Sequence, residues 1–122
     1  MDAEITYIGL KNIALQEFPD VVVSASVLRG PLNVAKSLRI FLTDNSFLEI
    51  WISNDKYSYH WQRIDKKICR HDNAPHKKHN HIKTFPKHFH DGSEDNAIES
   101  NISDKPNNAI REFLKFVREK IK

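Results

Sequence analysis

The chain has 122 residues, which is enough for one domain with a hydrophobic core and too short for two. Hydrophobic residues make up 39% and charged residues 29% of it, so we expect a modest core beneath a polar surface. The net charge of +3 is compatible with binding to a polyanion, whereas the single cysteine, Cys69, excludes an intramolecular disulfide and a cysteine-rich zinc knuckle.

The N-terminal segment predicts a helix over residues 3–18, which Pro19 ends. Its apolar residues fall at loosely helical spacing: Ile5, Ile8, Ile13 and Phe18. It has no basic stretch followed by a long apolar run, and no part of the chain reaches the ~18 apolar residues of a membrane span. We therefore expect a protein of the reducing cytoplasm that does not enter a membrane.

The middle of the chain predicts consecutive antiparallel strands. Residues 20–29 alternate with the period of a half-buried strand, Val21, Val23, Ala25 and Val27 on one side and Val22, Ser24 and Ser26 on the other. Residues 37–43 and 47–53 flank a short turn and predict a hairpin. Residues 56–64 and 67–72 continue the sheet, and the first of these places Tyr57, Tyr59 and Trp61 on one face.

The last part combines an irregular segment with a helix. Residues 73–106 contain three prolines and no long periodic run, so we expect irregular structure with a short strand around Lys83–Phe85. Residues 107–121 form an amphipathic pattern with Ile110, Phe113, Leu114, Val117 and Ile121 on one side. The prediction is a single α+β domain over residues 1–122, an antiparallel β-meander of four or five strands packed against N- and C-terminal helices.

Six of the seven histidines lie between residues 71 and 92, which makes residues 71–106 an irregular His-rich segment. A metal site is one interpretation, because His76, His79 and His81 lie close in sequence and a strand would point both rings of His88 and His90 to one face. The spacing matches no standard zinc finger. We expect no obligatory cofactor, with a divalent metal at the histidines as an alternative.

Acid–base cleavage of RNA is the second interpretation, since histidine titrates near neutral pH and can act as acid or base. Arg70 and lysines could stabilise phosphoryl oxygens, and the aromatic residues of the strand before it could stack bases. The third interpretation is a solvated loop without function, with Tyr57, Tyr59 and Trp61 in the core.

Three short motifs stand in order before the C-terminal helix. They are a Tyr-x-Tyr-His strand, an Arg-x-Asp-Asn-x-Pro-His segment and a Phe-Pro-x-His-x-His segment, supplied by Tyr57, Tyr59 and His60; by Arg70, Asp72, Asn73, Pro75 and His76; and by Phe85, Pro86, His88 and His90. This order, over about residues 38–122, resembles the TumE-like toxins of bacterial and archaeal toxin–antitoxin pairs. His71 departs from the pattern, in which an aromatic residue is expected, and the basic insert around His79 and His81 is unusual.

The resemblance implies a toxin that is encoded beside an antitoxin with a helix-turn-helix domain. Our prediction is a toxin that acts on RNA, as a ribonuclease that uses histidine acid–base chemistry. The alternatives are a non-enzymatic module that binds nucleic acid or a partner, and a metal-dependent nuclease. The candidate catalytic residues are His76, His88, His90, Arg70, Asp72 and Tyr57, and the candidate RNA-binding residues are Tyr59, His60, Lys77, Lys78 and Lys87. We expect His79 and His81 to supply only charge.

Overall fold

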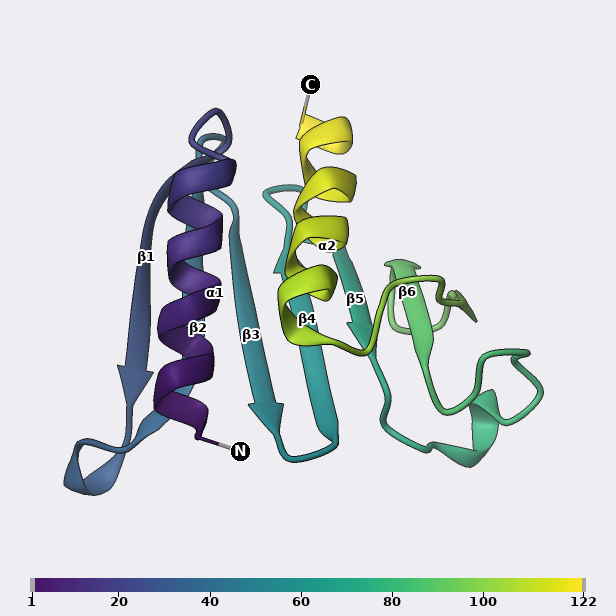
Figure 1. The fold of residues 1–122 in the computed structure, drawn as a ribbon. Helices are drawn as coiled ribbons and strands as arrows, with labels where there is room; N and C mark the ends of the chain where they lie inside the picture. The colour runs from purple at the N-terminus through teal and green to yellow at the C-terminus, as the bar shows by residue number, and fades with distance from the viewer. Residues whose placement is uncertain (1, 122) are drawn as a thin grey trace.

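The computed structural model describes residues 2–121 and consists of one antiparallel sheet with two helices on the same face (Figure 1). The elements are α1 (Ala3–Glu17), β1 (Val22–Arg29), the short 3₁₀ helix η1 (Pro31–Asn33), β2 (Ala35–Leu42), β3 (Phe47–Ser53), β4 (Lys56–Gln62), β5 (Ile68–Asp72), the 3₁₀ helix η2 (Lys77–His79), β6 (His88–Gly92), β7 (Ala97–Glu99) and α2 (Pro106–Ile121). The seven strands lie side by side in chain order. The predicted α+β meander is confirmed, with seven strands in place of four or five.

Helix α1 forms where predicted but buries a different face. Asp2 caps it by accepting a hydrogen bond from the Ile5 N–H, which satisfies a donor that the first turn leaves free. Its buried residues are Tyr7, Leu10 and Ala14, whereas Ile5 is 69% exposed. The expected Ile5–Ile8 stripe is wrong because Tyr7 anchors the helix to the sheet, where its hydroxyl accepts from the Ile52 N–H at 2.9 Å.

Strand β1 contains an irregularity that resets its alternation. The register against β2 shifts between Val22 and Ser24, so that Val21 and Val22 are both buried and Val23 is 63% exposed. A bulge of this kind sends successive residues to unexpected faces. The prediction that Val23 shares a face with Val21 is therefore wrong.

The three central hairpins agree with the sequence. Strands β2 and β3 join at Asp44, whose carboxylate accepts from the Ser46 N–H at 3.0 Å, and Asn45 takes the positive φ that the turn requires. The residues that share the helix-covered face are Leu38, Ile40, Leu48, Ile50, Ile52, Tyr57, Tyr59 and Trp61, and all are buried. The aromatic residues of β4 thus belong to the core.

The segment expected to be irregular contains two strands. Residues 81–86 form turns, so the short strand predicted around Lys83–Phe85 is wrong, and the strands lie at β6 and β7 instead. Residues 73–87 form a loop between β5 and β6 that includes η2. Helix α2 covers β4 to β6, where Phe113 contacts the rings of Tyr59 and Phe89, as its amphipathic pattern predicts.

Candidate functional site

Strands β5 and β6 send four polar side chains to the face opposite the two helices. In the antiparallel register Asp72 pairs with His88 and Arg70 pairs with His90. The residues between them, His71 and Phe89, point to the core, where both are buried. Because side chains alternate along a strand, Arg70, Asp72, His88 and His90 lie together on the uncovered face, as the H-x-H pattern predicts.

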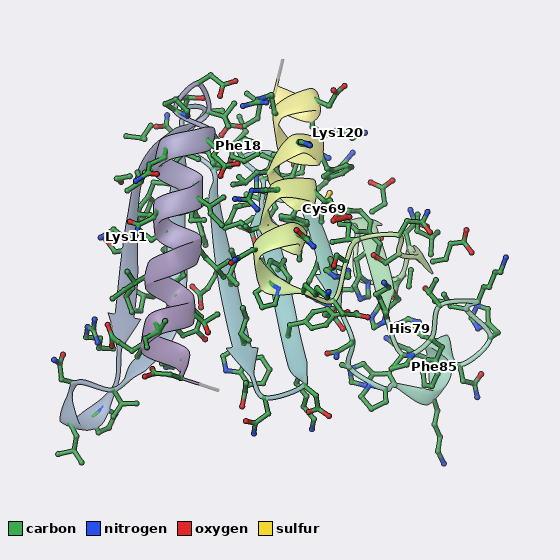
Figure 2. The ribbon with its side chains drawn as sticks, in the orientation of Figure 1. Lys11, Phe18, Cys69, His79, Phe85 and Lys120 are labelled. Atoms are coloured by element: carbon green, nitrogen blue, oxygen red, sulfur yellow. The ribbon has the colours of Figure 1, made fainter. Side chains whose placement is uncertain are left out.

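Three histidines gather on this face. His79, on η2 in the loop, meets His88 and His90 of β6, and one nitrogen of each ring lies within 4.8 Å of the other two. The ring centroids of His79 and His88 are 4.8 Å apart, as are those of His88 and His90. All three side chains are buried. We call this group the histidine cluster; Figure 2 shows His79 at the margin of the sheet, away from α1.

Asp72 connects the histidine cluster to Arg70. The Asp72 carboxylate lies 3.1 Å from His88 Nε2 and 3.7 Å from His90 Nε2, and it accepts a hydrogen bond from Arg70 Nε at 2.8 Å. Arg70 also donates two hydrogen bonds of 2.6 Å to Glu94, which lower the pKa of that carboxyl to about 2. The two carboxylates raise the pKa of Arg70 further above its ordinary value.

Hydrogen bonds from Nδ1 to backbone carbonyls fix the orientation of the His88 and His90 rings. His88 Nδ1 donates to the Pro86 carbonyl at 2.8 Å, and His90 Nδ1 donates to the Glu94 carbonyl at 3.0 Å. Since a carbonyl only accepts, each Nδ1 carries the hydrogen, and the neutral ring keeps a lone pair on Nε2. Burial lowers the pKa of His90 and of His79, with Arg70 adding to the effect at His90, so both rings favour the neutral form.

A groove runs along the uncovered face beside the cluster. Its lining includes Trp51, Ser58 and Arg70, and the loop residues Pro75 and His76 form one edge. The groove extends toward Arg39 and His60 on the neighbouring strands. Trp51 is 42% exposed there, and His76 is exposed beside the cluster, with its ring centroid 6.3 Å from that of His79.

Several residues proposed for the site direct their side chains elsewhere, although Tyr57 also contributes to the lining of the groove. Tyr57 and Tyr59 point to the helix-covered face; Tyr57 donates a hydrogen bond to Asp104, and burial raises the pKa of its hydroxyl. Tyr59 is buried under α2, near Phe113. Lys87 donates to the Ile102 carbonyl at 2.7 Å and so anchors the segment before α2.

Other proposed residues do flank the groove or cluster. His60 lies on the uncovered face beside Gln62, and burial lowers its pKa. Lys77 and Lys78 are exposed on η2, immediately before His79. The structure thus brings His88, His90, Arg70 and Asp72 together with His76 at the edge.

Sequence reasoning missed two residues of this region. Trp51 could have been found, since the buried phase of β3 is Leu48, Ile50 and Ile52, which leaves Trp51 facing outward. His79 was expected to supply only charge, but it lies inside the cluster while His76 is outside it. No spacing in the sequence indicates this, because the path of the loop decides it.

The arrangement has three chemical capacities. The three cluster histidines can hold a transition metal ion, since neutral imidazole is a common ligand. Arg70 can bind an anion in two-pronged fashion, as it binds Glu94. His76 can exchange a proton with a molecule in the groove, because its imidazole is exposed at the groove's edge. None of the helices among the described residues is long and apolar enough to span a membrane.

An antiparallel meander with helices on one face and a polar groove bordered by histidines on the other defines a small α+β protein. Comparison with models of protein families identifies the family to which the chain belongs. The family model described as "Toxin TumE" matches residues 11–121, and the chain belongs to this toxin family. Membership implies an antitoxin partner. No curated protein and no solved structure matches the chain.

Proposed function

We propose that this TumE-family toxin acts on RNA as a ribonuclease, with the groove and the histidine cluster as its active site. The supporting observation is that an exposed aromatic ring, an arginine and an exposed histidine line one groove: Trp51, Arg70 and His76. These are the groups needed to stack a base, bind a phosphate and transfer a proton.

The loop beside the groove has the charge for a polyanion. From Asn73 to His90 the sequence contains four lysines and no acidic residue. Lys77 and Lys78 are exposed on η2, next to the cluster. Cations at this place attract phosphate groups, and their contribution weakens as salt concentration rises.

Arg70 provides the phosphate-binding position in this proposal. Its guanidinium already holds the Glu94 carboxylate through two hydrogen bonds, which is the geometry that arginine also uses for phosphate. The Glu94 side chain is 59% exposed, so a phosphate can replace it without disturbing the core. Asp72 keeps the guanidinium in place through Nε.

His76 is the proton-transfer group that a polymer can reach. His88 and His90 are buried, whereas His76 is exposed at the edge of the groove. Cleavage of RNA by its own 2′-hydroxyl requires removal of one proton and donation of another, and an imidazole can serve either step.

The partner we propose is an antitoxin with a helix-turn-helix domain, and the place of action is the cytoplasm. A basic loop next to a reactive groove has to be covered while the cell grows. An acidic segment of the antitoxin would bind the lysines and compete with RNA for the groove.

The test is cleavage of end-labelled RNA by purified chain, compared with variants prepared in the same way. His76→Ala should lower the cleavage rate by about 10²–10⁴-fold. Trp51→Ala should weaken binding by about 1–3 kcal/mol. His81→Ala is the matched control, because His81 is an exposed histidine of the same loop. Tight RNA binding without cleavage would instead support the alternative of a non-enzymatic module.

A further inference from the structure

We infer that His79, His88 and His90 form a binding site for one divalent transition metal ion, with Zn²⁺ as the best match. The three rings come from two separate segments, η2 and β6, and place one nitrogen each within 4.8 Å of the other two. Proteins that bind zinc through histidine use this ligand type at Zn–N distances of about 2.0–2.1 Å.

Two ring nitrogens of the cluster lack a hydrogen-bond partner among the described residues. Nε2 of His79 and Nε2 of His88 are fully buried and make no hydrogen bond with any residue of the described chain. A buried polar atom without a partner is costly, and few are found in folded proteins. His88 Nε2 also lies 3.1 Å from the Asp72 carboxylate without a hydrogen bond between them. The negative charge of this carboxylate favours a cation in the cluster.

The backbone groups that bond to His88 and His90 are of the kind found around metal-binding histidines. Metal-binding histidines commonly donate their second ring N–H to a carbonyl or carboxylate, which fixes the tautomer and the orientation of the ring. His88 does so to the Pro86 carbonyl and His90 to the Glu94 carbonyl. Both rings thereby direct Nε2 toward the Asp72 side of the cluster.

A proton could also supply the positive charge, but it serves only one ring at a time. Protonating His88 and His90 together would place two cations with ring centroids 4.8 Å apart, beside the Arg70 guanidinium that Asp72 already holds. A single metal ion satisfies all three nitrogens at once. The Asp72 carboxylate remains bonded to Arg70 and to the Ala74 N–H. It is therefore not a ligand, but its negative charge favours a cation in the cluster.

Zinc binding would draw the three rings together. Tetrahedral ligand nitrogens at the usual bond length lie about 3.4 Å apart, which is less than the 4.8 Å within which the ring nitrogens of the cluster lie. Three protein ligands leave a fourth position for water, as in catalytic zinc sites. A role of this fourth position in RNA cleavage rests on the proposed function. The binding of the metal does not depend on that function.

The test measures metal on the untagged chain, made in a cell-free system so that toxicity does not limit expression. The protein is stripped with chelator, loaded with Zn²⁺, freed of excess metal and assayed by mass spectrometry. We expect about one equivalent per chain and a higher melting temperature with Zn²⁺ than with chelator. Cobalt should give the visible absorption of a tetrahedral site.

His79→Ala is the decisive variant, because His79 stands on the loop and its loss leaves the sheet intact. Loss of a partner that bonds to a metal ligand weakens metal binding by about 10–100-fold. Loss of the ligand His79 itself should weaken Zn²⁺ binding by more than this. His81→Ala, on the same loop but outside the cluster, should bind as the parent does. Absence of zinc from the folded parent chain, or equal binding by both variants, overturns the site. Metal-free chain that still cleaves RNA would leave the proposed function standing, and metal binding without cleavage would leave the site standing.

Discussion

Arg70 and Glu94 form a two-pronged ion pair at the edge of the groove, with both nitrogen–oxygen distances at 2.6 Å. In the proposed function the carboxylate occupies the position that a phosphate group would take, and its pKa of about 2 keeps it charged near neutral pH. Glu94 therefore competes with any anion that approaches Arg70.

Replacing Glu94 by Gln should strengthen RNA binding. An exposed pair of this kind contributes about 0.2–1 kcal/mol, so we expect an affinity gain of up to about 5-fold at low salt. The gain should shrink as salt screens the charges. Filter binding at two salt concentrations measures it, with Glu119→Gln on the exposed side of α2 as the charge-matched control. Equal effects of the two variants would mean that only net charge matters.

The histidines should separate into two groups in a toxicity assay. His79→Ala, His88→Ala and His90→Ala should abolish growth inhibition, because each removes one member of the cluster. His76→Ala should also lose activity by about 10²–10⁴-fold, through loss of proton transfer. His81→Ala should remain toxic. Growth curves after induction, with protein levels checked by immunoblot, give the result; persistent toxicity of His79→Ala would assign that residue to charge alone.

Tyr57 should matter for stability and not for activity. Its hydroxyl donates to Asp104 on the helix-covered face, away from the histidine cluster. Hydrogen bonds to a charged partner contribute about 1.5–3 kcal/mol, so Tyr57→Phe should lower the free energy of unfolding by an amount in that range or below it. Urea unfolding measures this change. If the variant folds normally but loses toxicity, Tyr57 takes part in the reaction after all.

Helix α2 should depend on Phe113, which is fully buried against the rings of Tyr59, Phe89 and Phe116. Replacing it by Ala leaves a cavity and should cost ~3–5 kcal/mol of stability. Lys115→Ala, on the exposed side of the same helix, should change stability by less than ~0.5 kcal/mol. Similar costs for the two variants would contradict the packing of α2 on the sheet.

Stability should fall in mild acid because of His71. This ring is buried between Tyr57 and Tyr59 and bonded to Ser100, and burial together with the charge of Lys87 lowers its pKa to about 4, with Asp104 and Asp72 opposing the shift. The unfolded chain takes up the proton near pH 6.5 and the folded chain only near pH 4, so stability is complete above pH 6.5 and declines between these values.

The size of this effect is about 3 kcal/mol over that pH range, from the shift in the pKa of His71. Urea unfolding at several pH values, in the presence of chelator, measures the slope. His71→Phe keeps an aromatic ring at the position and removes the titration, so its stability should change less between pH 6.5 and pH 4. A slope that is the same in both proteins would place the acid sensitivity elsewhere.

The sequence predicted the central strands and α2 because their alternation and their turns are local signals. It failed at β6, where His88 and His90 have no apolar alternation and the strand exists because β5 pairs with it. It also failed at Val23, since a bulge is not encoded in the pattern of apolar residues. At the site, the shared face of His88 and His90 follows from strand alternation, but the position of His79 depends on how a loop folds.

The order of the strands has a consequence for how the molecule assembles. Each strand pairs with the one before it in the sequence, so the sheet can form by closing one connection at a time. Contacts of much longer sequence separation include the ion pairs of Arg111 with Glu17 and of Arg118 with Asp20, which join α2 to the end of α1. The docking of the two helices therefore requires the longest loop closure, and the histidine cluster can assemble before it.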